Sequence, residues 1–414
     1  MRNELENVRV PVVGSIKPQI NRYYLKVSRR YMVAGILLMV TLVLYIMGVM
    51  AFFGDYVTYD NLKYLSRDFS AISFGGSSDF TSVVYNGREN MKFEYFRGGV
   101  AMVNGETLTY YDPSGIPLID EKLNYSSPVV VGGDKYMLVY DLGAKEYSIY
   151  NQLTKIIERE TDERIVTCDI ATDGASIIVT RSKETKYVVS LYNAAFNKSM
   201  SIYKDNYVID AAISPDGKRI VICSAIPSES DFSCEIDVCA AGKKESVRVL
   251  TYEHTMPLDV YTTGDGFVLL CDRGIYFYDY EGKSVGSHTF DGMELKYADI
   301  NEKTVAVVGS TDDLGNKSRL LVFDNKGDRV CDCMIEERVV GVYAGRDTET
   351  AAAYLKTSNN IISVSYGGDK NFLFTPDNAG EIVSAVPVNG GAIVCRRNGA
   401  EFVARMDNSN GKAN

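Results

Sequence analysis

Histidine is almost missing from this sequence, because only His254 and His288 occur among its 414 residues. A Ser-His-Asp triad needs a histidine beside an exposed nucleophile, and no Gly-x-Ser-x-Gly elbow supplies that nucleophile. The two histidines, 34 residues apart, also form no zinc-binding pattern. We place His254 in a link between repeats and His288 on an outer strand. The sequence therefore predicts no catalytic residue and no metal-binding residue.

The motifs that hold nucleotides and metal ions are absent as well. The chain contains no Gly-x-x-x-x-Gly-Lys phosphate loop, no Gly-x-Gly-x-x-Gly turn, no calcium loop and no Cys-x-x-Cys pair. Its net charge of −10 argues against a nucleic-acid partner, since phosphate binding draws on a basic surface. We expect a protein that is not an enzyme and that carries no cofactor.

One stretch is long, apolar and free of charge: Tyr31–Gly54. As a helix, its core Met32–Phe53 would extend about 33 Å, which matches the hydrocarbon layer of a membrane, about 30 Å thick. A cleaved signal peptide is the alternative, but its apolar region is shorter, and no Ala-x-Ala site follows here. The sequence predicts one uncleaved transmembrane helix at residues 31–54.

The charges on either side of this helix differ in sign. Residues 1–30 contain seven Lys or Arg and two Glu, a balance of +5, which leaves −15 for the rest of the chain. Positive flanks stay in the cytoplasm, so we expect a single-pass protein of the cell membrane with a cytoplasmic N-terminus and an extracytoplasmic C-terminal domain. The expected parts are a basic cytoplasmic tail, the helix, a juxtamembrane linker, a folded domain and a C-terminal tail: 1–30, 31–54, 55–80, 81–407 and 408–414.

The folded domain repeats one pattern along its length. Short apolar runs alternate with turns and keep no helical period, which is typical of an all-β domain. An aromatic or apolar residue followed by a turn recurs at spacings of 39, 42, 46, 40, 45, 41 and 42 residues. This period suits the four-stranded blade of a β-propeller, about 40 to 45 residues long. The markers are Tyr111-Asp112, Tyr150-Asn151, Tyr192-Asn193, Val238, Tyr278-Asp279, Phe323-Asp324, Val364 and Met406-Asp407.

A second turn signal falls between these markers, where the inner two strands of a blade would join. Asp173-Gly174, Asp216-Gly217 and Asp265-Gly266 are each followed by an apolar strand. We predict type I′ hairpins there, with positive φ at both central residues.

Four strands in each repeat give seven full blades and an eighth that is one strand short. The missing strand is available in Thr81–Asn86, and pairing the two chain ends would remove the open edges of the ring. We predict an eight-bladed β-propeller, with seven blades as the alternative.

The run Ser214-Pro215-Asp216-Gly217-Lys218, together with the period, resembles the WD40-like, TolB-like and quinoprotein-like propellers. The order of basic tail, anchor, connector and propeller resembles an uncharacterised family of single-pass membrane proteins of Gram-positive anaerobes, described as a domain of unknown function. The resemblance carries no active-site motif. The chain has no tryptophan, so it lacks the Trp-Asp signature of WD40 repeats and the Gly-x-x-x-Trp motif of quinoprotein dehydrogenases.

Two acidic residues are the candidates for a binding site. Asp210 and Asp259 each lie seven residues before the Gly of their Asp-Gly turn, which places them at equivalent positions on inner strands near the channel. A ring of such carboxylates would bind a cation or a sugar. The alternative is that these side chains hold only water and each other.

Eight cysteines allow a disulfide in an exported domain, although a domain of this size does not need one. Cys223 and Cys234 lie on strands that we expect to be adjacent, so they are the favoured pair; the alternative is that all eight are buried thiols.

Because propellers host many unrelated functions, the fold alone names none. We expect a protein-interaction scaffold of the cell envelope, with a channel that senses a small ligand as the alternative.

Overall fold

The structure is a computed structural model of the whole chain. The chain forms two compact units, residues 1–62 and 63–414, and each is described by itself. The predicted linker and the C-terminal tail lie outside the described residues, as do residues 1–21. The described residues are 22–53, 82–85, 90–229, 231–243, 245–312, 314–346, 351–358, 360–366, 368, 370–373, 381–388 and 390–404.

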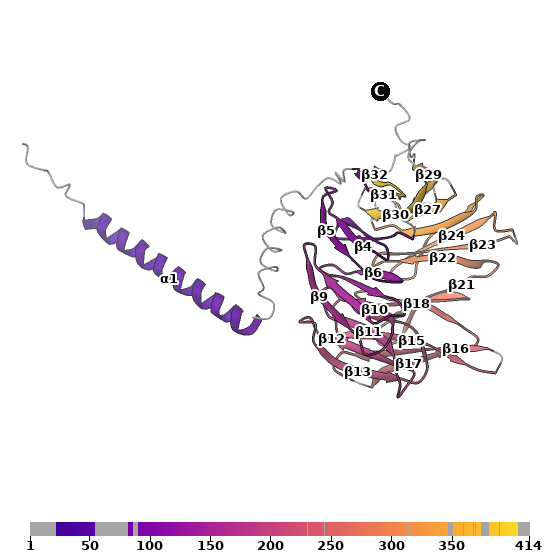
Figure 1. Cartoon of the computed structure of the whole chain (residues 1–414), viewed down its shortest axis with the longest axis horizontal. Helices are drawn as coiled ribbons and strands as arrows, with labels where there is room; N and C mark the ends of the chain where they lie inside the picture. The colour runs from indigo at the N-terminus through magenta and orange to yellow at the C-terminus, as the bar shows by residue number, and fades with distance from the viewer. Residues whose placement is uncertain are drawn as a thin grey trace, which may run out of the picture. The chain divides into compact units, whose positions relative to one another are not determined.

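The first unit contains helix α1, Arg22–Phe53 (Figure 1). Its segment Val27–Gly48 is long and apolar enough to cross a membrane, and these properties fit an anchor and a signal sequence alike. An N-terminal apolar helix is confirmed, and it begins at Arg22, nine residues before the segment predicted to span the membrane. Residues 22–30 contain Leu, Lys and Arg, which favour helices, and neither Gly nor Pro, so nothing ends the helix at the charged flank.

The second unit is built from eight four-stranded antiparallel sheets, as the repeat period predicts (Figure 1). The first four blades follow in chain order. Blade 1 comprises β2 (Lys92–Phe96), β3 (Gly99–Val103), β4 (Thr107–Tyr111) and β5 (Pro117–Lys122). Blade 2 comprises β6 (Pro128–Gly132), β7 (Met137–Asp141), β8 (Glu146–Tyr150) and β9 (Lys155–Glu160). Blade 3 comprises β10 (Ile165–Ile170), β11 (Ser176–Arg181), β12 (Tyr187–Tyr192) and β13 (Lys198–Lys204). Blade 4 comprises β14 (Tyr207–Ile213), β15 (Arg219–Pro227), β16 (Phe232–Ala240) and β17 (Ser246–Tyr252).

The other four blades continue the series. Blade 5 comprises β18 (Pro257–Thr262), β19 (Gly266–Cys271), β20 (Gly274–Asp279) and β21 (Ser284–Thr289). Blade 6 comprises β22 (Glu294–Ile300), β23 (Thr304–Ser310), β24 (Ser318–Asp324) and β25 (Arg329–Ile335). Blade 7 comprises β26 (Val339–Ala344), β27 (Ala353–Thr357), β28 (Ile361–Val364) and β29 (Lys370–Leu373). Blade 8 comprises β30 (Ile382–Val388), β31 (Gly391–Arg396), β32 (Gly399–Ala404) and the N-terminal β1 (Val83–Val84).

Strand β1 closes the ring, as we predicted. It pairs with β32 through Val83 opposite Ala400 and Val84 opposite Gly399. The next residue reinforces the closure, because the Tyr85 hydroxyl lies 2.7 Å from the carbonyl oxygen of Arg396 and 2.9 Å from that of Gly399. The two ends of the propeller chain are thereby held in one sheet.

The core consists of eight apolar clusters, one between each pair of neighbouring blades. The second strands are the most deeply buried; all of the residues in β19 and β23 are buried, for example. Burying one Val, Leu, Ile or Phe contributes about 1.5–3 kcal/mol, so each blade is stable only against its neighbours. The ring folds as one body for this reason.

The turns explain why aspartate and asparagine recur in the repeat. At the ends of four third strands the side-chain oxygen of an aspartate or asparagine accepts the N–H groups two and four residues later. These residues are Asp112, Asn193, Asp279 and Asp324. The residue three positions later has positive φ in every case. Such local bonds set the turn without tertiary contacts, which makes the period visible in the sequence.

The prediction of type I′ hairpins is wrong at all three Asp-Gly pairs. At Asp173-Gly174 and Asp216-Gly217, positive φ occurs at the glycines, +97° and +70°, but not at the aspartates. At Asp265-Gly266 neither residue has positive φ, and Gly266 begins strand β19. Asp173 accepts the N–H of Ala175 at 2.9 Å, and Asp216 accepts that of Lys218 at 3.1 Å. This bond to the second following residue holds the aspartate in an ordinary turn conformation.

The cysteines are free thiols, and all eight lie among the described residues. Cys223 and Cys234 lie on the paired strands β15 and β16, but Cys223 is opposite Ile236 and Cys234 is opposite Ala225. Both are fully buried and pack with Cys271 in the cluster between blades 4 and 5. The favoured disulfide is therefore not formed, and the thiols serve as small apolar groups of the core.

Candidate functional site in the propeller channel

The first strand of each blade is the innermost, and neighbouring first strands contact one another around the channel. In six consecutive blades, 3 to 8, the pairing of this strand with the second is interrupted by one extra residue. A β-bulge of this kind turns the side chains that follow it. The residues directly after it are Thr167, Asp210, Asp259, Tyr297, Gly341 and Ser384.

Asp210 and Asp259 thus occupy equivalent positions on the inner strands of blades 4 and 5. Asp210 joins three blades, since one carboxylate oxygen accepts the Thr167 hydroxyl at 2.8 Å and the other accepts the Val260 N–H at 3.2 Å. These bonds give Asp210 a structural role in the ring.

The surroundings of Asp259 favour its protonated form. Water reaches its side chain from the channel, but the surrounding protein limits its solvation. This desolvation raises the pKa of Asp259 well above its usual range, and the charge of Asp210 and a hydrogen bond between the two carboxyl groups raise it further. The protonated form of Asp259 therefore persists to higher pH than that of an ordinary aspartate.

A second pair of channel aspartates lies two residues after the bulge. Asp169 on β10 accepts the N–H of Ile213 in blade 4 at 2.8 Å, and Asp299 on β22 accepts that of Ala344 in blade 7 at 2.7 Å. Burial raises the pKa of Asp169 to about 7 and also raises that of Asp299, although these backbone bonds oppose the shift.

We did not predict Asp169 and Asp299 from the sequence. A signal for them is present: both are followed by isoleucine at the end of the inner strand, and the turn begins directly afterwards.

Glu94 on β2 adds a fifth carboxyl group, and Arg346 is its basic neighbour. The Arg346 guanidinium lies 4.0 Å from the Glu94 carboxylate and 4.1 Å above the ring of Tyr95. Burial raises the pKa of Glu94 to about 7 against the opposing charge of Arg346. The inner strands thus carry an acidic lining whose members bond mainly to neighbouring blades.

The geometry of this lining limits its chemistry. Within the described ranges, no group of three or more His, Cys, Asp or Glu side chains converges closely enough to hold a metal ion. What the arrangement can do is take up protons near neutral pH and accept hydrogen bonds from hydroxyl or ammonium groups.

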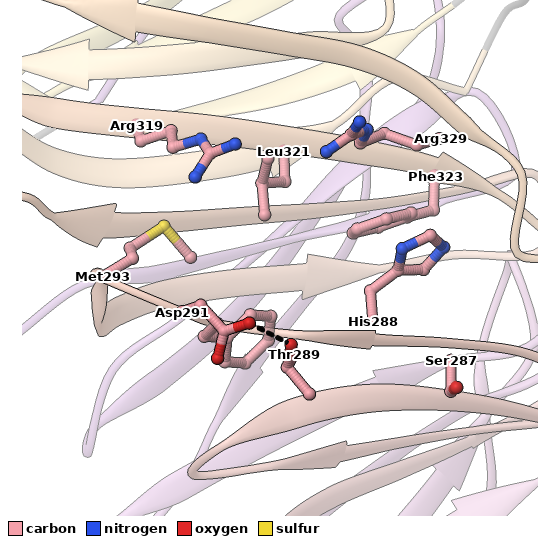
Figure 2. A pocket seen from close by; sticks show the side chains of 10 residues that line it. Ser287, His288, Thr289, Asp291, Met293, Arg319, Leu321, Phe323 and Arg329 are labelled. Atoms are coloured by element: carbon pink, nitrogen blue, oxygen red, sulfur yellow. Dashed lines mark hydrogen bonds between the residues drawn. The ribbon is translucent and has the colours of Figure 1, made fainter.

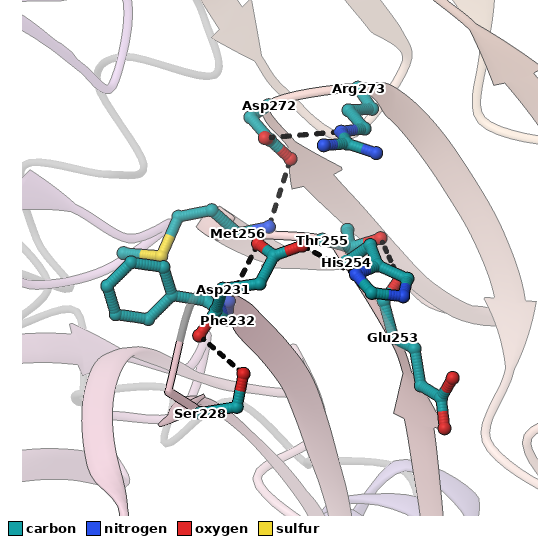
Figure 3. A network of polar contacts seen from close by, with 9 residues as sticks. All are labelled: Ser228, Asp231, Phe232, Glu253, His254, Thr255, Met256, Asp272 and Arg273. Atoms are coloured by element: carbon teal, nitrogen blue, oxygen red, sulfur yellow. Dashed lines mark hydrogen bonds and ion pairs between the residues drawn. The ribbon is translucent and has the colours of Figure 1, made fainter.

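His254 lies in the link between blades 4 and 5, with φ of +55°. Its Nδ1 atom lies 2.5 Å from a carboxylate oxygen of Asp231, and the Ser228 hydroxyl donates to the backbone oxygen of Asp231 (Figure 3). The hydrogen bond from His254 lowers the pKa of Asp231. In a catalytic triad the serine hydroxyl contacts the histidine ring, whereas the Ser228 hydroxyl contacts the backbone of Asp231. The exposed pair of His254 and Asp231 therefore holds the link between blades 4 and 5 in place.

His288 lies on β21, the outermost strand of blade 5. Its Nε2 atom is 2.8 Å from the carbonyl oxygen of Gly327 in the β24–β25 turn, and its ring centroid is 4.5 Å from that of Phe323 (Figure 2). His288 therefore connects the outer parts of blades 5 and 6. Both histidines lie where the sequence places them, on a link and on an outer strand.

Comparisons with known proteins agree with this fold. The model of a family of unknown function, DUF5711, matches residues 75–403. No curated protein sequence matches the chain.

Solved structures match at low sequence identity. Chaetomium thermophilum Sqt1 bound to the N-terminus of the ribosomal protein L10 is 11% identical, with a TM-score of 0.50, over 78% of this chain and 99% of that chain. Kuenenia stuttgartiensis hydrazine synthase is 12% identical, with a TM-score of 0.45, over 68% of this chain and 94% of that chain. At such identities the likeness concerns the fold alone.

Proposed function

The chain belongs to the DUF5711 family of unknown function, and from its architecture we propose that it is a membrane-anchored protein-interaction scaffold that is not an enzyme. In this proposal α1 crosses the cell membrane, the basic N-terminal residues stay in the cytoplasm, and the propeller binds a protein partner of the cell envelope. The charge difference across α1 supports this orientation.

The observation that carries the proposal is the use of the channel carboxyl groups. Asp169, Asp210 and Asp299 each accept a backbone N–H of a neighbouring blade. Groups tied into the scaffold in this way are not free to move protons on a substrate, because catalysis requires a base within reach of the reacting atom. What the ring offers is a rigid set of blade surfaces for a partner.

Cross-linking in intact cells tests this proposal. We would compare the full chain with a chain whose residues 1–54 are replaced by a cleavable secretion signal. The expected result is a defined protein partner that is captured by the anchored chain and lost from the released one.

Turnover of a glycan, peptide or ester substrate by the purified full chain would contradict the scaffold role. Such turnover would identify the protein as an enzyme.

The contact between Asp210 and Asp259 favours a second candidate, a channel that binds a cation or a sugar. Calcium chloride and a panel of monosaccharides would be tested as thermal-shift probes. The variant Asp259→Asn keeps a hydrogen-bond donor for Asp210 and removes the titrating group. A shift that disappears in this variant but persists in Asp205→Asn, an exposed surface control, would support the channel site. A shift that is unchanged would exclude it.

A further inference from the structure

A groove outside the channel lies between blades 5 and 6. Its volume is about 330 Å³, at the lower end of the range for small-molecule sites, about 300–1000 Å³. One wall is formed by β21 and the link after it, with His288, Thr289 and Asp291. The other wall carries Arg319 and Arg329 from blade 6 (Figure 2).

The floor between these walls is made of apolar side chains that are themselves almost completely covered, and most of the surface that the groove presents is polar. Phe290, Met293, Leu321 and Phe323 line it, and all four are buried. Arg319, Leu321 and Phe323 alternate on β24, so they share one face of the strand. The two guanidinium groups point toward each other across Leu321 (Figure 2). A ligand in the groove would therefore meet the guanidinium groups and other polar atoms, with a small apolar area at the floor.

The two arginines share one carboxylate. Arg319 donates to Asp332 from Nε at 2.9 Å and from Nη2 at 2.8 Å, and Nη1 of Arg329 lies 3.0 Å from the same carboxylate. Each guanidinium has five N–H donors, whereas one carboxylate offers about four acceptor sites. Asp332 can satisfy fewer than half of these donors. The N–H donors that Asp332 leaves unsatisfied can bind a second carboxylate, because the planar guanidinium fork matches the geometry of that group.

Asp291 on the opposite wall restricts the charge of the ligand. It accepts the Thr289 hydroxyl at 2.7 Å and places a second negative charge at the groove. The four charged residues therefore sum to zero. The groove therefore has no excess positive charge to attract a dianion such as phosphate, whereas a single carboxylate can accept the guanidinium N–H groups that Asp332 leaves over.

We propose that this groove binds a monocarboxylate joined to a short apolar group, with the carboxylate between Arg319 and Arg329 and the apolar group on Leu321 and Phe290. The C-terminus of a peptide that ends in an apolar residue has this chemistry, and so does a free branched-chain acid. The site is independent of the membrane anchor and of the channel.

Calorimetric titration of the purified full chain in detergent tests the proposal. The probes are 4-methylpentanoate and acetyl-Gly-Gly-Leu with a free C-terminus, each compared with its neutral amide. We expect both acids to bind and both amides and inorganic phosphate not to bind. Tighter binding of the peptide would identify a peptide C-terminus as the source, and equal binding would identify the free acid.

Three variants are expected to weaken the binding of the acids, to tighten it and to leave it unchanged. Arg329→Gln should weaken binding about tenfold, because it removes a charge-assisted hydrogen bond. Asp332→Asn should tighten binding several-fold, because it releases both guanidinium groups from their competitor. Arg273→Gln removes an exposed arginine at another turn of blade 5 and should change nothing.

An absence of binding by both acids would overturn the proposal, as would weaker binding in Asp332→Asn. Thermal unfolding of each variant shows whether it is folded, so that a loss of binding is not confused with a loss of structure.

Discussion

At the scale of single residues, aspartate serves two purposes in this protein. In the turns after the third strands it fixes the backbone, and in the channel it joins inner strands of different blades. The first use is local in sequence, so the turn aspartates were predicted. In the channel, Asp210 and Asp259 were predicted because both lie seven residues before the Gly of an Asp-Gly turn, whereas Asp169 and Asp299 were not predicted. A contact between residues more than 40 positions apart leaves no periodic signal of its own.

The turn at Asp324 gives a direct test of the first purpose. Its side chain accepts the N–H groups of Lys326 and Asp328 at 2.9 and 2.8 Å. We expect Asp324→Ala to lower the free energy of unfolding by about 1 kcal/mol, as the loss of a helix cap does. Urea denaturation measures the change. Asp328→Ala alters an exposed side chain of the same turn and should stay within about 0.5 kcal/mol of the parent protein.

The second purpose, the role of the channel aspartates, is tested by the pH dependence of stability at Asp259. Its pKa is raised in the folded chain, so between its unfolded value, about 4, and its folded value the native state binds the extra proton. Its contribution to stability is therefore complete at acid pH and is lost as the pH rises through the folded pKa. We expect Asp259→Asn to exceed the parent protein in thermal stability by more at pH 8 than at pH 5.

The same reasoning applies to Asp169 and Glu94, whose pKa values are about 7. The stability that each contributes in its protonated form is lost between about pH 4 and pH 7. Asp205→Asn, at an exposed position, serves as the control for Asp259→Asn. If the difference in thermal stability between Asp259→Asn and the parent did not change from pH 5 to pH 8, the raised pKa of Asp259 would be excluded.

At the scale of elements, the strands were predictable and their irregularities were not. The turn residues and the alternation of apolar and polar residues predicted eight blades. They also predicted that a strand before the first blade, now β1, completes the eighth. Both signals depend on neighbours in the sequence. The bulges of the inner strands and the start of α1 at Arg22 depend on packing and on the absence of a stop signal. The register of β15 and β16 likewise decided that Cys223 and Cys234 stay unpaired.

The closure by β1 gives a prediction at this scale. The Tyr85 hydroxyl bonds to two carbonyl oxygens of blade 8, so Tyr85→Phe leaves both without that donor. We expect a loss of about 1–2 kcal/mol in the free energy of unfolding. Tyr203→Phe, at an exposed tyrosine on β13, should have no measurable effect on urea denaturation. An equal loss in the two variants would mean that Tyr85 does not hold the closure.

At the scale of the whole molecule, the chain contains a closed propeller ring and one apolar helix. Closure removes the free sheet edges at the ends of the ring, and the apolar clusters between all neighbouring blades make the ring rigid. A rigid ring suits the binding of partners, whereas the sequence holds no motif that names a reaction. The central claim is that α1 holds this ring on the outer side of the cell membrane.

Labelling of lysines in intact cells tests that claim most directly. A membrane-impermeant amine reagent would be added before and after lysis, and the labelled residues identified by mass spectrometry. Lys183 on blade 3 is 86% exposed and reports on the propeller, whereas Lys17 reports on the N-terminal tail. The account predicts that Lys183 is labelled in intact cells and Lys17 only after lysis. Labelling of Lys183 only after lysis would contradict it.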